Sequence, residues 1–183
     1  MNKALRRYTC IALIGLFASS VLAAAPDIAK LRQQYDGYLV KLGSARKEQH
    51  SRWVVSYAKS LQVLEKQLQS EGKLDELIAV KGELKRFKEM RSLLPDTRGD
   101  APHELRELQD RFRKNRSTNE YEHNQKVMKL AEQYDAKLAA YQKQLTKDGK
   151  IDEALKVREE RRRAEEHEAV TAAKFELAAL EEA

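Results

Sequence analysis

Two stretches of the chain are alike: residues 57–89 read YAKSLQVLEKQLQSEGKLDELIAVKGELKRFKE, and residues 134–166 read YDAKLAAYQKQLTKDGKIDEALKVREERRRAEE. When they are aligned on their glycines, Gly72 and Gly149, 13 of 33 positions are identical. Similarity at a fixed spacing is typical of a repeated structural unit. The pair therefore predicts a duplicated helical hairpin whose copies are 77 residues apart.

Each glycine stands where one helix is expected to end and the next to begin. Glycine readily adopts the left-handed conformation that ends helices. Asp75 and Glu76 follow Gly72, and carboxylates in a first helical turn oppose the positive end of the helix dipole. Apolar residues recur at three- and four-residue steps on both sides of this glycine, namely Tyr57, Leu61, Leu64 and Leu68, then Leu77, Val80, Leu84 and Phe87. This spacing predicts two helices that pack along one stripe.

Extending the pattern outward predicts an all-α chain made of two long, coiled-coil-like hairpins. The first helix is expected over about residues 27–69, and Gly43, which weakens a helix interior by ~1 kcal/mol relative to alanine, favours a kink or break there. The helix after Gly149 is expected to continue as one element to the C-terminal residues. Two prolines and a glycine interrupt the pattern between the hairpins. The predicted units are hairpin 1 in residues 25–94, a linker in 95–102 and hairpin 2 in 103–183.

The two arms of hairpin 1 differ in length, and this inequality leaves an apolar stripe uncovered. The stripe consists of Ile28, Leu31, Tyr35, Tyr38 and Leu42. The returning helix is too short to reach it, because a helix rises only ~1.5 Å per residue. Soluble monomers usually hide or use such a surface. We expect either a homo-oligomer or docking of the first helix on hairpin 2.

Residues 1–24 have the composition of a signal peptide. Lys3, Arg6 and Arg7 precede an apolar run over residues 11–21, and small residues follow, with cleavage expected after Ala23 or Ala24. An uncleaved anchor is the alternative, but the run is shorter than the ~20 residues that span a bilayer. The only cysteine, Cys10, lies within this segment. We expect an exported protein, periplasmic or secreted, with neither a disulfide nor a stable membrane anchor after cleavage.

Composition favours long helices over a compact enzyme core. Charged residues make up 35% of the chain and aromatic residues 7%. The formal net charge is +6, and removal of the three bases in residues 1–24 leaves +3. A general polyanion-binding protein is more basic than this, so no specific nucleic acid is expected as a partner.

Motifs that carry catalysis are absent from the sequence. It contains no glycine-rich phosphate loop, no CxxC and no HExxH. Glu120 and His123 have the spacing of half a di-iron site, but the second pair that such a site needs is missing. His50, His103 and His167 are expected on the surface, and solvated histidines, His123 included, are expected to titrate near the reference value of about 6.5. We therefore predict a non-enzymatic protein without a cofactor or a metal.

The densest basic run is the candidate partner-binding surface. It comprises Arg111, Arg113, Lys114 and Arg116. Clustered guanidinium groups bind phosphate or carboxylate surfaces. The alternative is pairing within the helix with acidic neighbours such as Asp110. Trp53 and the helically spaced tyrosines are expected to be packing residues.

The repeated phrase from Tyr57 to Glu83, and again from Tyr134 to Glu160, resembles a helical-hairpin unit of exported bacterial coiled-coil proteins. The resemblance implies an all-helical fold and an exported compartment, and it implies no active residue. We expect a helical scaffold or interaction protein with a protein partner. The alternative is a periplasmic holdase that protects unfolded clients.

Overall fold

A computed structural model describes residues 27–93 and 101–181. Within these ranges it contains five helices, which account for 91% of the residues, and no strand. The prediction of an all-α chain is confirmed. The predicted signal peptide and most of the predicted linker lie outside the described residues.

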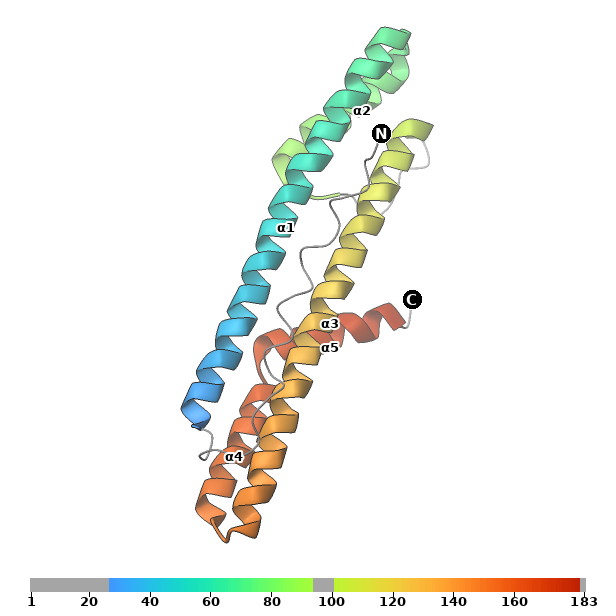
Figure 1. Cartoon of the computed structure of the whole chain (residues 1–183). Coiled ribbons are helices and arrows are strands. Elements are labelled where there is room, and N and C mark those ends of the chain that lie inside the picture. Colours follow the sequence, from blue (N-terminus) through green and yellow to red (C-terminus); the bar gives the residue numbers. More distant parts are fainter. Residues whose placement is uncertain (1–26, 94–100, 182–183) are drawn as a thin grey trace, which may run out of the picture.

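Two long antiparallel helices form the frame of the molecule (Figure 1). These are α1 (Ile28–Glu71) and α3 (His103–Lys147). Helix α2 (Leu74–Met90) folds back along the end of α1, and α4 (Ile151–Glu165) folds back along the end of α3. Helix α5 (Glu168–Glu181) lies across α3 near the middle of the molecule.

The two glycine turns have the same geometry, as the sequence predicts. Gly72 has a φ of 71° and Gly149 a φ of 72°, both in the left-handed region. In each turn the amide of the following lysine donates to a carbonyl of the last helical turn: Lys73 to Leu68 at 3.1 Å, and Lys150 to Leu145 at 2.9 Å. These bonds satisfy carbonyl groups that the ending helix leaves without partners.

Apolar side chains gather in two separate cores, one at each end of the frame. The α2 core contains Trp53, Tyr57, Leu61, Leu64 and Leu68 of α1, Val80, Leu84 and Phe87 of α2, and Leu105, Leu108 and Phe112 of α3. The α4 core contains Tyr35 and Leu39 of α1, Val127, Tyr134, Leu138 and Leu145 of α3, Ala154, Val157 and Ala164 of α4, and Val170 and Ala173 of α5. Helices α1 and α3 therefore each belong to both cores.

Residues 77 positions apart take part in opposite cores, and this relation extends beyond residues 57–89. Leu105, Leu108 and Phe112 of α3 pack in the α2 core, and their counterparts Ile28, Leu31 and Tyr35 of α1 pack in the α4 core. The ring of Phe112 lies 5.0 Å from that of Tyr57, and the ring of Tyr35 lies 4.2 Å from that of Tyr134. Each end is thus a pair of helices completed by the long helix from the other end, and α5 adds a fourth helix to the α4 core.

The apolar stripe at the start of α1 is covered within the chain. Ile28, Leu31 and Leu42 pack against the α4 core, to which Tyr35 itself belongs. We expected the stripe to be covered either by another copy of the chain or by hairpin 2. In the structure it packs against helices of hairpin 2.

The structure differs from two expectations about helix ends. Helix α1 continues through Gly43 without interruption, because residues on either side of it, Leu39 and Trp53, are held in the two cores. The single helix expected after Gly149 is in fact two, α4 and α5. At the break, Nδ1 of His167 accepts the amide hydrogen of Ala169 at 3.1 Å, in the manner of a helix N-cap. The change of direction brings Val170 onto the α4 core.

Candidate functional site: a basic groove between α1, α3 and α5

A buried tyrosine, a buried glutamate and a partly exposed arginine form the same network in each core. In the α2 core, Tyr57 donates to Glu83 at 3.0 Å and Arg86 donates to Glu83 at 2.7 Å. In the α4 core the residues 77 positions later repeat these contacts: Tyr134 donates to Glu160 at 2.9 Å, and Arg163 donates to Glu160 at 2.8 Å. Each network joins a long helix to the short helix that follows it.

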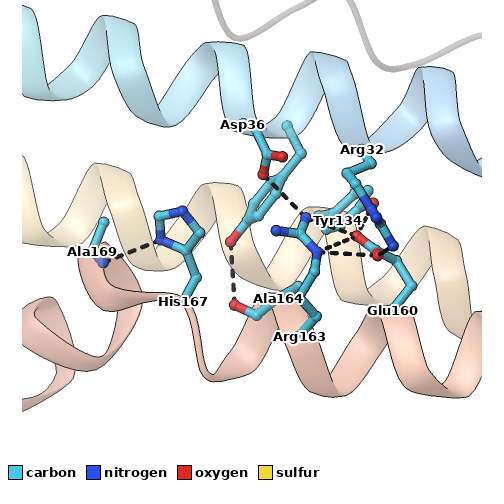
Figure 2. A network of polar contacts seen from close by, with 9 residues as sticks. Arg32, Asp36, Tyr134, Glu160, Arg163, Ala164, His167 and Ala169 are labelled. Atoms are coloured by element: carbon cyan, nitrogen blue, oxygen red, sulfur yellow. Dashed lines mark hydrogen bonds and ion pairs between the residues drawn. The ribbon is translucent and has the colours of Figure 1, made fainter.

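At the α4 end the network also reaches α1 (Figure 2). Arg32 donates to Glu160, and Arg163 donates to Asp36 at 3.1 Å. The side chain of Glu160 has no exposed surface. Burial alone raises the pKa of a carboxyl group, but hydrogen bonds from Arg163, Arg32 and Tyr134 outweigh burial and lower the pKa of Glu160. The negative charge of Glu160 is balanced by its hydrogen-bond donors. We therefore interpret this network as a structural link between α1, α3 and α4.

At the α2 end, no ion pair among the described residues links this network to the other long helix. The positions that correspond to Arg32 and Asp36 are Gln109 and Arg113. Arg113 pairs with Asp110 of its own helix at 2.8 Å. The buried Gln109 Oε1 has no hydrogen-bond partner among the described residues. The two ends therefore share one network, and only the α4 end adds ion pairs to α1.

The predicted basic surface is spread around α3. Successive residues of a helix point about 100° apart, so Arg111, Arg113, Lys114 and Arg116 do not share one face. Arg116 pairs with Glu120 at 2.9 Å and lies 5.9 Å from the ring centroid of Trp53 in α1. Pairing within the helix, the alternative drawn from the sequence, is present for Arg113 and Arg116.

A groove of about 620 Å³ opens between the two cores, where α1, α3 and α5 meet. Arg46, Lys47, His50 and Trp53 line it from α1. Arg116, Asn119, Glu120 and His123 line it from α3, and Ala169, Ala172 and Ala173 from α5. Its size is within the range of ligand-binding clefts.

Cations predominate along this groove. Its lining includes three permanent cations, Arg46, Lys47 and Arg116, and one carboxylate, Glu120. A second carboxylate, that of Glu176, lies 3.5 Å from Arg46, and both of these side chains are 40% exposed. Exposed ion pairs of this kind contribute only about 0–1 kcal/mol. The arginines can therefore exchange these partners for the carboxylates of a ligand at little cost.

His123 differs from the solvated histidine that the sequence predicts. It is half-buried in the groove wall, and burial, followed by the positive charge of Arg46, lowers its pKa below the usual value. The expected solvated position of His123 is therefore wrong, and its titration behaviour stays a prediction. His167 is also half-buried, and its ring meets that of Tyr35 edge to face at 6.3 Å. His50 and His103 are exposed, as expected.

Trp53, the only tryptophan, lies at the boundary between the α2 core and the groove. Its indole Nε1 donates to the carbonyl of Phe112 at 3.1 Å. The ring of His50 is stacked with it at 5.8 Å, and Arg116 is close to its ring. The packing role predicted for Trp53 is confirmed, and the residue also provides a fluorescent reporter of the groove.

Among the described residues, no group of three His, Cys, Asp or Glu side chains is arranged to hold a metal ion. No helix in those ranges is both long and apolar enough to cross a membrane. The chain matches no family model, no curated protein and no solved structure.

Proposed function

We propose that the protein is a non-catalytic helical scaffold that acts after export and binds a protein partner through cationic surfaces of α1 and α3. The observation that carries this proposal is the contrast between the ends and the middle of the frame. Each end is fixed by a core and a satisfied Tyr–Glu–Arg network, whereas the middle presents a concave cationic surface. Binding groups held on rigid elements keep their geometry without cost when a partner arrives.

We further propose that the chain arose by duplication of one helical hairpin. Three kinds of equivalence at the same 77-residue offset support this: the left-handed glycine turns, the Tyr–Glu–Arg networks, and the apolar residues that complete each core. On this interpretation each copy runs from the start of a long helix to the end of the following short helix. Helix α5 is an addition to the second copy.

Photo-crosslinking in the native host tests the scaffold proposal. A photoreactive amino acid at the exposed Asn115 is expected to form a defined adduct with one protein partner. The double reversal Arg111→Glu/Lys114→Glu should remove this adduct, whereas the reversal Lys143→Glu/Lys147→Glu at the other end of α3 should retain it; all four side chains are exposed. No adduct in the wild-type background, or equal loss in both variants, contradicts the proposal.

Export is tested separately by determining the N-terminus of the protein recovered from its host. The proposal requires a mature chain that begins after Ala23 or Ala24 and is found outside the cytoplasm. A chain that keeps residues 1–24 and stays in the cytoplasm would refute it.

A holdase for unfolded clients is the second candidate, and one feature of α5 favours it. Phe175 is 77% exposed, and Leu180 on the same helix is 45% exposed. Exposed apolar side chains of this kind can contact unfolded chains. Suppression of client aggregation at equimolar protein, lost in Phe175→Lys, supports the holdase. Aggregation that proceeds unchanged excludes it.

A further inference from the structure

The groove lies where the two related halves of the frame meet. Three pairs of its lining residues are 77 positions apart, one member on α1 and the other on α3: Gly43 and Glu120, Arg46 and His123, and Lys47 and Asn124. If the two halves of the frame changed places, each of these residues would take the position of its partner in the pair, so the centre of the groove would stay where it is. Whatever packs on one side of this centre has an equivalent position on the other.

Helix α5 occupies one of these two positions. Its Val170 and Ala173 pack in the α4 core together with Val127 of α3, and its Glu176 accepts a hydrogen bond from Asn124 at 2.7 Å. The residue 77 positions before Val127 is His50, which is exposed. The side of α1 that is equivalent to the α5 seat is thus open among the described residues, and it forms one wall of the groove of about 620 Å³.

The open position has different chemistry from the occupied one. Buried Val127 corresponds to His50, buried Asn124 to Lys47, and half-buried His123 to Arg46. Arg116 faces this position from α3, beside Trp53. An apolar helix such as α5 would add no counter-charge to Arg46, Lys47 and Arg116, two of which pair with partly exposed carboxylates, whereas an acidic helix would pair with all three.

We propose that this groove binds an acidic helical segment of the partner protein, with its carboxylates toward Arg46, Lys47 and Arg116 and its small residues against Ala169 and Ala172. The inference rests on the proposed scaffold function and names the site and the chemistry of the partner. The occupant fills, on the α1 side, the position that α5 fills on the α3 side.

Trp53 fluorescence of the full mature chain tests the proposal. The probe is a capped synthetic peptide of Glu, Ala and Leu with Glu residues three and four positions apart, and a peptide with Lys in place of Glu is its control. We expect a saturable change in Trp53 emission with the acidic peptide only, and an affinity that falls as salt rises. The double substitution Arg46→Gln/Arg116→Gln should weaken binding about tenfold or more.

The matched control is Arg158→Gln/Arg162→Gln, which removes the same charge from exposed positions of α4 and should bind like the wild type. Circular dichroism verifies that both variants stay helical. The absence of a saturable signal, or equal weakening in both variants, overturns the inference. Tighter binding of inorganic tripolyphosphate or of a DNA duplex through the same two arginines also overturns it, in favour of a phosphate-bearing partner.

The outcome also separates this inference from the scaffold proposal. If Arg46→Gln/Arg116→Gln binds the peptide normally while Arg111→Glu/Lys114→Glu still loses its cellular adduct, the partner binds the outer face of α3. In that case the scaffold proposal is retained, and the groove is not the binding site of the partner.

Discussion

Glu160 is a buried carboxylate on which three side-chain donors converge. It accepts hydrogen bonds from Tyr134 of α3, Arg163 of α4 and Arg32 of α1, so one carboxylate joins three helices. Among the described residues, its counterpart Glu83 joins two helices, α1 and α2, through Tyr57 and Arg86. A buried charge destabilises the fold when its partners are removed. Partner groups that are left without the buried charge destabilise it in the same way.

We expect Glu160→Gln to lower the free energy of unfolding by about 2–3 kcal/mol, because the amide cannot satisfy two guanidinium groups. Both arginines are partly exposed, and water can therefore solvate them in the variant. Urea denaturation of Glu160→Gln and Glu83→Gln provides the comparison. Glu160→Gln should be the more destabilising of the two, and equal losses would show that the tie to α1 contributes nothing.

His123 provides a pH-dependent signal from the groove. Its folded pKa lies below the unfolded reference of about 6.5, so the unfolded state binds the proton more readily. Its contribution to stability is therefore complete above about pH 6.5 and is lost as pH falls through the folded pKa. An NMR titration should place the His123 midpoint below the reference value of about 6.5.

Arg46→Gln should move the His123 midpoint upward only in part, since burial is the larger cause of the shift. A complete return to the reference value would mean that the charge of Arg46, and not burial, controls the histidine. No displacement in the wild type would place His123 in solvent.

At the scale of elements, the two glycine turns fix where the long helices end. A β-branched side chain resists positive φ, so Gly72→Val and Gly149→Val should each destabilise the protein by about 1 kcal/mol or more. Gly37 is a control with the opposite sign, because it lies within α1 with open space where a Cβ would stand. Gly37→Ala should raise stability by up to about 1 kcal/mol. Thermal melts that rank these variants differently would contradict the assigned turns.

The elements that were predictable from the sequence are those fixed by local signals. Helices α1 to α4 follow from apolar spacing and from the two Gly-Lys-x-Asp-Glu turns. The break between α4 and α5 was missed because a histidine is an unusual N-cap, and no glycine or proline marks the site. The groove was missed because its residues come from three separate segments, and only the antiparallel packing of α1 on α3 brings them together.

At the scale of the molecule, the two cores share their long helices, and this sharing should make unfolding cooperative. Tyr35 and Trp53 lie in different cores. We expect Tyr35→Ala to cost about 3 kcal/mol and to shift the urea midpoint reported by Trp53 fluorescence as much as the midpoint reported by circular dichroism. A Trp53 transition that stays in place while helicity is lost earlier would show that the ends unfold independently.

Arg32 and Glu160 form a pair although they are 128 positions apart in the sequence. During synthesis, Arg32 therefore leaves the ribosome long before its partner is made. The start of α1 is made early, but the parts of α3 and α4 that cover it, which include Tyr134 and Glu160, are made much later. During that interval its apolar residues have no partner within the nascent chain. Under the proposed export, a chain in this form can still thread through a narrow translocation channel, whereas a hairpin that completes its own core would already have folded.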